Sequence, residues 1–349
     1  MSTAAALILF TAITVYAVFG GADFGAGFWD LVAGGARRGQ RPREVIDHSI
    51  APVWEANHVW LIFVFVVLWT CFPTAYASIM LTLFVPLTLA ALGIVLRGAS
   101  FAFRKVVIRT RDQRNFGAAF ALGSVLVPYS LGAVVGAVAS GRVPSGGQAG
   151  DPWSSWVNPT STVIGVLAVC TSAYLAAFFL VSDAGRLSDD TMVAYFRRRA
   201  TYAAVAAGVV ALAGIFVLRG DATYLFDGLS SRALPLVILS AICGLGAPAL
   251  HTRHAHRGAR LAAAGAVVGV LLAWGVAQWD YLLPTSLTVA AAAAPSGAIS
   301  AVFVATGLAA LLIVPAFVLL YVLDQRSLLP EESVPEPTTA EPTTARSRT

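Results

Sequence analysis

The sequence predicts an all-α integral membrane protein, and three observations support this. The chain has 349 residues, of which 58% are hydrophobic and only 12% charged, and its mean hydropathy is +0.77. Soluble globular proteins carry about 25% charged residues and about 45–50% apolar ones, so this composition argues strongly against a water-soluble fold. Long apolar stretches recur along the chain, and the positive charges gather between them. The three cysteines, Cys71, Cys170 and Cys243, lie inside apolar stretches without the spacing of a disulfide framework or a metal site.

Nine apolar stretches are long enough to form membrane-spanning helices, because such a helix needs about 20 apolar residues. They run approximately over residues 4–22, 54–72, 76–96, 115–139, 161–183, 200–218, 233–250, 261–281 and 298–323. No positively charged segment precedes the first stretch, so we expect a retained span and not a cleaved signal peptide. Neighbouring helices can satisfy the carbonyl groups that a proline frees. Four prolines are therefore compatible with these spans: Pro86, Pro128, Pro248 and Pro315. No strand periodicity is evident.

The distribution of positive charge predicts the orientation of the spans. Twenty of the 23 lysines and arginines lie in alternate connections or in the C-terminal tail, and only Arg142, Arg219 and Arg232 lie elsewhere. Cytoplasmic loops carry an excess of these residues, so we expect the N-terminus outside and the C-terminus in the cytoplasm. The regular alternation also supports the count of nine spans, because a missed helix would disrupt it.

We expect a single transmembrane domain over residues 1–329, followed by a cytoplasmic tail over 330–349. The tail is rich in Pro, Thr and Glu and has no apolar periodicity, which predicts disorder. Before the eighth span, His251, His254 and His256 lie close together in a basic connection. They either bind a metal or belong to a solvated loop beside anionic headgroups, and we favour the solvated loop.

Carboxylates inside spans are costly to bury and therefore point to functional sites. Asp23 lies near the inner end of the first span, in the stretch GGADFGAGFWD. The glycines of this stretch either allow another helix to approach closely or let the helix distort. For Asp23 we weigh a role in proton transfer against a structural salt bridge or a helix cap. Arg97, at the end of the third span, either pairs with such an acid or extends to the headgroups, which is the commoner outcome.

Glu55 lies in the opening turns of the second span, within SIAPVWEANHVWLIF. His58 follows three residues later, so the two side chains share a helix face. A carboxylate beside an imidazole at the cytoplasmic boundary can collect protons and pass them inward. The alternative is an interfacial glutamate stabilised by the helix dipole next to a packed histidine. Trp54 and Trp60 are typical of interface anchors.

The other carboxylates at span ends suggest no chemistry. Asp280 and Asp183 terminate the eighth and fifth spans, where we expect them to be exposed to solvent. A haem between helices needs axial ligands at membrane depth. Within the predicted spans, His58 is the only histidine and Met80 the only methionine, and no CxxCH motif or nucleotide-binding loop is present. We therefore expect this chain to hold no cofactor and no metal of its own.

Several ordered blocks of sequence resemble subunit II of the cytochrome bd-type quinol oxidases. They are GGADFGAGFWDL, HSIAPVWEANHVWLIF, LWTCFPTAYASIM and LGIVLRGASFAFR within about the first 105 residues, and more weakly WDYLLPTSLTVAAAAAPS with the final span. The middle of the chain matches only as spans. Several long blocks in the same order are far more specific than any one motif.

The resemblance implies two four-helix bundles plus a peripheral ninth helix. It also implies a heterodimer with a similarly folded subunit I, which carries haem b, haem d and the quinol site. That complex oxidises quinol and reduces O2 to water with protons from the cytoplasm, in the bacterial cell membrane. A small accessory subunit is left open, and a nucleic-acid partner is not expected.

The resemblance also assigns roles to single residues. Glu55 matches the acid of the PxWE or PxWD stretch, which in this family lies on a proton path to subunit I. His58 occupies a position where other members carry Gln, and with Asp23 it completes our candidates for the proton path. Trp60 and Arg97 match positions associated with the oxygen route, and together with Trp54 they are candidates for that route or for the subunit interface.

Two other functions are compatible with the residues. One is a proton-coupled transporter in which Asp23 and Glu55 are the coupling carboxylates. Transporters often contain inverted repeats with broken helices at corresponding positions, and the glycine-rich segment after the first span has no evident counterpart. The other is a scaffold subunit without a role in proton transfer.

Overall fold

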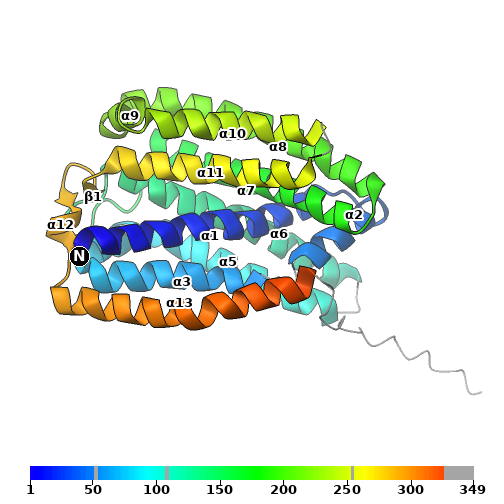
Figure 1. Cartoon of the computed structure of the whole chain (residues 1–349), viewed down its shortest axis with the longest axis horizontal. Coiled ribbons are helices and arrows are strands. Elements are labelled where there is room, and N and C mark those ends of the chain that lie inside the picture. The colour runs from blue at the N-terminus through cyan, green and yellow to red at the C-terminus, as the bar shows by residue number, and fades with distance from the viewer. Residues whose placement is uncertain (51–53, 107–109, 253–254, 326–349) are drawn as a thin grey trace, which may run out of the picture. The chain divides into compact units, whose positions relative to one another are not determined.

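The computed structural model describes residues 1–50, 54–106, 110–252 and 255–325, with the side chains of some of these left out. Within these residues the chain is helical apart from loops and one short hairpin (Figure 1). In chain order the elements are α1 (Ser2–Leu31), α2 (Ala36–Ile50), α3 (Trp54–Cys71), α4 (Pro73–Thr82), α5 (Phe84–Val106), α6 (Thr110–Ala139), α7 (Pro159–Arg186), α8 (Asp190–Asp221), α9 (Thr223–Ser230), α10 (Leu234–Thr252), α11 (His256–Gln278), β1 (Tyr281–Leu283), β2 (Leu287–Thr288), α12 (Val289–Ala292) and α13 (Ser296–Gln325).

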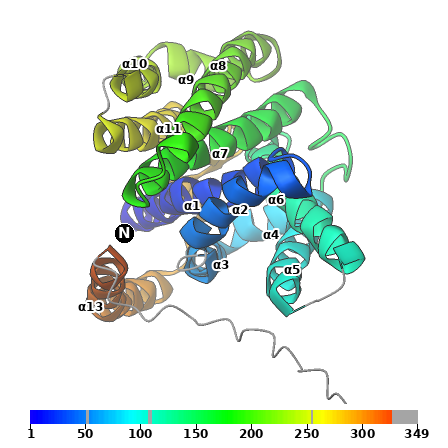
Figure 2. The same cartoon turned by 90° about the vertical axis from the view of Figure 1, so that its right-hand side faces the viewer.

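Residues 1–303 form one compact unit, in which α1 and α7 lie side by side (Figures 1 and 2). Helix α1 also packs on α3 and α6, and α6 packs on α5. Helix α7 also packs on α8 and α11, and α11 packs on α10. The largest buried apolar cluster centres on α7, where Leu175, Phe178 and Val181 are buried. Helix α1 therefore contacts α3 and α6 as well as two helices of the group around α7, namely α7 itself and α11.

The predicted spans coincide with helices, and several helices extend beyond the predicted ends. By length and composition, seven of the described helices can cross a membrane, and the bent pair of α4 and α5 makes an eighth. Helix α3 has only a shorter apolar part, Asn57–Cys71, among the residues used for that test. The chain is thus a multi-pass membrane protein, while the count of nine spans and the orientation stay predictions.

The third predicted span, over residues 76–96, is not one straight helix. The axis bends by 83° between α4 and α5. Pro86 explains this break, because proline has no N–H to donate to the carbonyl of Thr82 and its ring clashes with that carbonyl. Helix α4 accordingly ends at Thr82, and Pro86 lies in the first turn of α5, where a missing N–H costs nothing.

The structure also contains elements that the sequence analysis does not predict. The basic connection after the first span forms helix α2, whose Val45 and Ile46 are buried in the cluster around α7. The connection before the last span contains the hairpin of β1 and β2, in which Tyr281 pairs with Thr288. Strands of two or three residues are too short to leave a periodic signal in the sequence.

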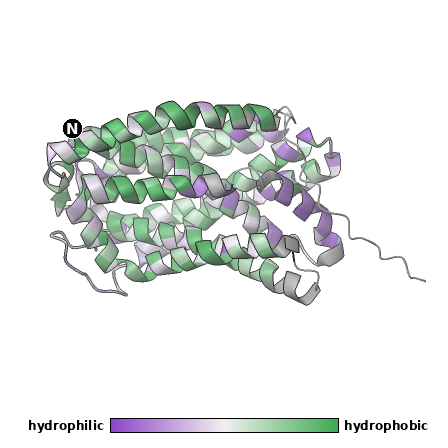
Figure 3. Cartoon of the chain, turned by 90° about the horizontal axis from the view of Figure 1, so that it is seen from below, coloured by the Kyte–Doolittle hydropathy of each residue, from purple (hydrophilic) through white to green (hydrophobic). Residues whose placement is uncertain are grey.

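Hydrophobic residues cover the lengths of the helices, and hydrophilic residues gather toward their ends, most densely at the end where α2 lies (Figure 3). Many large apolar side chains on α8 and α10 are exposed, including Phe216 and Leu245. This distribution is the one expected for helices whose outer faces contact lipid.

Candidate functional site

A buried ion pair joins α1 to α5. The Arg97 guanidinium donates from Nη1 to Asp23 Oδ2 at 2.8 Å and from Nη2 to Asp23 Oδ1 at 2.7 Å. A third hydrogen bond runs from Nη2 to the Asp23 backbone oxygen at 3.0 Å. Arg97 is 1% and Asp23 5% exposed, so both charges are removed from solvent. The two residues are 74 positions apart in the chain, and this geometry selects the salt bridge over extension of Arg97 to the headgroups.

Helix α6 completes the surroundings of Arg97. Arg97 Nε donates to Ser124 Oγ of α6 at 3.0 Å, and Ser124 Oγ in turn donates to the Phe120 carbonyl at 2.7 Å. The guanidinium carbon also lies 5.0 Å from the centre of the Phe24 ring and 4.7 Å from that of Phe120. Stacking on aromatic faces stabilises a desolvated cation, so Arg97 is held by hydrogen bonds and by the rings around it.

Glycines make this arrangement possible. A Cβ at Gly27 would overlap the Ser124 hydroxyl, and a Cβ at Gly123 would press on the Gly93 carbonyl and on Arg97. A Cβ at Gly25 would overlap the backbone carbonyl of Ser172 on α7. The glycines of the GGADFGAGFWD stretch therefore serve close helix packing around the ion pair, and α1 remains an uninterrupted helix through them.

Near the ion pair lie two buried polar atoms that have no hydrogen-bond partner within the described part of the chain. They are the Tyr16 hydroxyl and His58 Nδ1. Both rings contact Phe24, with ring centres 6.5 Å away for Tyr16 and 5.9 Å away for His58. Buried polar groups without partners are rare and usually mark an ordered water or a functional group. His58 thus lies against Phe24, the residue that follows Asp23 on α1.

Helix α1 carries a further buried carboxylate, Asp30. Arg43 on α2 donates from Nε to Asp30 Oδ1 at 2.6 Å and also bonds the Gly34 carbonyl. Tyr16, Asp23 and Asp30 follow one another at intervals of seven residues, which places them along one stripe of the helix. This spacing was the signal available in the sequence for Tyr16 and Asp30, which the sequence analysis does not single out.

Outside the spans, Asp189 ties α2 to the start of α8. It accepts hydrogen bonds from the Met192 backbone N–H and from Arg41 Nε, at 3.0 and 2.9 Å. The backbone hydrogen bond of Met192, and then the Arg41 side chain, hold the pKa of Asp189 below its usual value. The carboxylate is thus ionised at neutral pH and caps α8.

The structure describes some of the other predicted site residues and not others. The side chains of Glu55 and Trp54 lie outside the described residues, as do His254 and the side chain of His256. Trp60 packs beside the cluster of Tyr16, Phe24 and Val127. Asp280 is exposed, as expected.

Two expectations are wrong. His251 is not part of a solvated loop: α10 continues to Thr252, and the buried His251 ring stacks on Phe178 with centres 4.9 Å apart. Asp183 is not exposed to solvent, because Arg186 and Arg260 pair with it at 2.7 and 3.7 Å and α7 is packed against α11 there.

Among the described residues, no group of three or more His, Cys, Asp or Glu could hold a metal ion.

Comparison with known protein families shows to which family the chain belongs. Residues 1–324 match the family described as cytochrome bd terminal oxidase subunit II. This chain belongs to that family. The resemblance seen in the sequence motifs is thereby confirmed over almost the whole chain, and the transporter hypothesis gives way to an oxidase subunit.

Individual relatives agree with the family. The chain is 30% identical over 112 residues to cytochrome bd ubiquinol oxidase subunit 2 of Bacillus subtilis, covering 32% of each chain. It is 28% identical over 219 residues to cytochrome bd-I ubiquinol oxidase subunit 2 of Escherichia coli K12, covering 59% of this chain and 54% of that one. The chain thus spans about a third to a half of the length of these curated relatives.

A solved structure supports the fold over a longer range. A chain of the bd oxidase from Geobacillus thermodenitrificans superposes with a TM-score of 0.76 at 25% sequence identity. The superposition covers 94% of this chain and 98% of that one. The helical arrangement described above is therefore the fold of a bd oxidase chain.

The family implies haem groups in the assembled oxidase, so we asked whether this chain's residues fit one. A haem between two axial histidines requires both rings to face one space. His58 and His251 lie on α3 and α10, and their rings pack on different phenylalanines, Phe24 and Phe178. The described part of the chain does not provide a pair of axial histidines.

Proposed function

We propose that this chain is the haem-free subunit II of a quinol oxidase in a bacterial cell membrane, with its N-terminus outside and its C-terminal tail in the cytoplasm. The family match over residues 1–324 carries this proposal. In it, the chain forms a heterodimer with subunit I, which holds haem b and haem d and oxidises quinol. Electrons from quinol and cytoplasmic protons reduce O2 to water in that partner.

In this proposal the Asp23–Arg97 pair is a fixed structural element. The pair is neutral as a whole, and Arg97 satisfies the carboxylate with two side-chain hydrogen bonds. A carboxylate that left these hydrogen bonds would leave the buried guanidinium without a counter-charge. We therefore assign to Asp23 the positioning of α1 against α5, next to the path, and not the transfer of protons itself.

We assign proton uptake to Glu55 and His58. The two residues are one helical turn apart on α3, and His58 Nδ1 is buried with no hydrogen-bond partner among the described side chains. A neutral imidazole nitrogen in that position can accept a proton from a carboxylic acid or from a bridging water. Asn57, buried beside them, donates from Nδ2 to the Phe19 carbonyl at 3.4 Å and ties this part of α3 to α1.

The first experiment tests the complex. Expressed alone, the chain is expected to bind no stoichiometric haem, because the one histidine and one methionine of the predicted spans, His58 and Met80, cannot supply the usual axial ligand sets. Expressed with a haem-bearing partner and purified through a tag on this chain, it is expected to yield a complex with b- and d-type haem absorption and quinol-driven O2 consumption. About one haem per chain in the single-chain preparation would contradict the assignment.

The second experiment tests Glu55 in that complex. Glu55→Asp keeps a titratable acid and is expected to retain most of the O2 consumption. Glu55→Gln is expected to slow it about tenfold or more, the scale of losing a positioned proton-transfer group. Asp280→Asn serves as the control, since it removes an exposed carboxylate at the other end of the spans and should change nothing.

Haem absorption separates the two ways in which the Glu55→Gln complex could fail. Normal haem with slow O2 consumption supports proton delivery, and reduced haem would indicate defective assembly. A Glu55→Gln complex with full haem and full turnover would remove Glu55 from the path and support a scaffold role for this subunit.

A further inference from the structure

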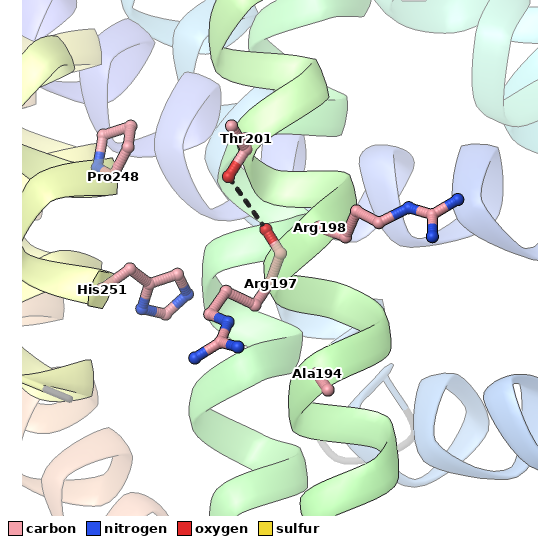
Figure 4. A pocket seen from close by; sticks show the side chains of 6 residues that line it. All are labelled: Ala194, Arg197, Arg198, Thr201, Pro248 and His251. Carbon is pink, nitrogen blue, oxygen red and sulfur yellow. Dashed lines mark hydrogen bonds between the residues drawn. The ribbon is translucent and has the colours of Figure 1, made fainter. Parts of the chain in front are cut away.

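A cleft of about 530 Å³ opens between α8 and α10, away from the Asp23–Arg97 site. Its walls are Ala194, Arg197, Arg198 and Thr201 of α8 and Pro248 and His251 of α10. Figure 4 shows the Arg197 and His251 side chains pointing into the space between the two helices, while Arg198 extends along the other side of α8. The Thr201 hydroxyl donates to the Arg197 carbonyl at 3.2 Å, which leaves its oxygen able to accept.

The two arginines at this cleft have no counter-charge among the residues that the structure describes. Six other arginines with described side chains pair with a carboxylate, as Arg43 does with Asp30 and Arg142 with Asp221. No carboxylate of the described residues lies within ion-pair distance of the Arg197 or Arg198 guanidinium. Arginine presents a fork of N–H donors that matches phosphate oxygens, so the cleft favours a phosphate-bearing anion.

The cleft lies where the charged ends of the two helices change to apolar surface. Toward its C-terminus from Arg197, α8 exposes Val205 and Leu212. Toward its N-terminus from His251, α10 exposes Leu245 and Ile242. Only 11% of the apolar stretch of each helix is buried within the chain. A ligand whose charged head occupies the cleft can therefore extend apolar chains along both helices.

Residues of both walls of the cleft pack against α7. The His251 ring is fixed by its stacking on Phe178 of α7. Pro248 interrupts the hydrogen bonding of α10 one turn before His251, at the height of Thr201 (Figure 4). On α8, Phe196 and Ala200 are buried against α7 and orient Arg197 toward the cleft.

We propose that this cleft binds the phosphate headgroup of an anionic phospholipid, with the acyl chains lying along α8 and α10. The guanidinium of Arg197 is the principal contact and Thr201 lies next to the headgroup, while Arg198, on the other side of α8, adds positive charge near the site. Basic pockets between spans at the membrane boundary favour anionic headgroups over zwitterionic ones. This proposal does not depend on the assignment of the proton path.

The test uses the full chain, with its partner where that is needed for solubility, in neutral detergent. Phosphatidylglycerol and phosphatidylcholine are titrated separately, and native mass spectrometry counts the bound lipid. Each arginine near an anionic surface contributes a factor of about five in affinity. Arg197→Gln is therefore expected to weaken phosphatidylglycerol binding about fivefold, and the Arg197→Gln/Arg198→Gln variant by more than about tenfold.

Two matched variants control for charge and for folding. Arg219→Gln removes an exposed arginine from the opposite end of α8 and should bind phosphatidylglycerol as the wild type does. Arg197→Lys retains the charge and should lose less than Arg197→Gln. The melting temperature without lipid should be the same in all variants, since no described carboxylate pairs with Arg197 or Arg198.

Three results would overturn the proposal. The double variant could bind phosphatidylglycerol as tightly as Arg219→Gln, which would remove the arginines from the site. Phosphatidylcholine could bind the wild type as tightly as phosphatidylglycerol, which would remove the selectivity for an anion. An excess of inorganic phosphate could displace the lipid and bind equally well, which would make free phosphate the ligand.

Discussion

Replacing Asp23 by Asn is expected to destabilise the complex by about 3–5 kcal/mol, the scale of leaving one partner of a buried ion pair uncompensated. The Arg97 side chain is only 2% exposed and cannot reach water without moving α5 from α1 and α6. Arg97→Gln is expected to be destabilising on the same scale, because it leaves the Asp23 carboxylate buried and unpaired. Thermal unfolding of the purified complex, followed by the loss of haem absorption, measures both effects.

The Asp23→Asn/Arg97→Gln double variant is the informative control. It removes both charges and keeps side chains that can hydrogen-bond each other, so it is expected to recover much of the lost stability. The ion-pair interpretation would be contradicted if the double variant were no more stable to thermal unfolding than the less stable of the two single variants. The O2 consumption of the double variant then distinguishes a structural role of Asp23 from a role in proton transfer. Recovered stability with recovered turnover supports a structural pair, whereas recovered stability without turnover would return Asp23 to the proton path.

Gly25→Ala is expected to lower stability by about 1–3 kcal/mol, the scale of overpacking a tight contact. The added Cβ would overlap the carbonyl oxygen and carbon of Ser172 on α7. These are backbone atoms, so no side-chain rotation can relieve the overlap, and α1 and α7 must separate. Because α1 carries Asp23 two residues before Gly25, the displacement should also weaken the pairing with Arg97.

Gly208→Ala on α8 is the matched control for Gly25→Ala. A Cβ at Gly208 meets nothing within 4 Å, and alanine has the higher helix propensity by about 1 kcal/mol. This variant is therefore expected to be neutral or slightly stabilising in the same unfolding experiment. Equal melting temperatures for Gly25→Ala and Gly208→Ala would show that close contact of α1 with α7 is not what requires glycine at position 25.

Much of the fold follows from the sequence, because membrane insertion depends on local properties. Hydropathy over a window of about 20 residues predicts where helices lie, and the structure has a helix at every predicted span. The ordered motifs of the first 105 residues were enough to indicate the family, which the match over residues 1–324 confirms. The candidate site was foreseen as residue types, namely an acid in the first span and an arginine ending the third.

The tertiary structure decided how these residues are combined. Whether Arg97 extends to the headgroups or pairs with Asp23 depends on the approach of α5 to α1, which Gly93 and Gly123 permit where α5 meets α6. His251 is buried because Phe178 of α7 covers it, although its sequence neighbours are basic and polar. Hydropathy and charge are properties of one segment, so the sequence by itself determined where the long apolar helical segments lie and which family the chain belongs to, but not α2 or the break between α4 and α5. Pairing and burial depend on which faces of distant helices meet and how closely, and only the packed structure decides that.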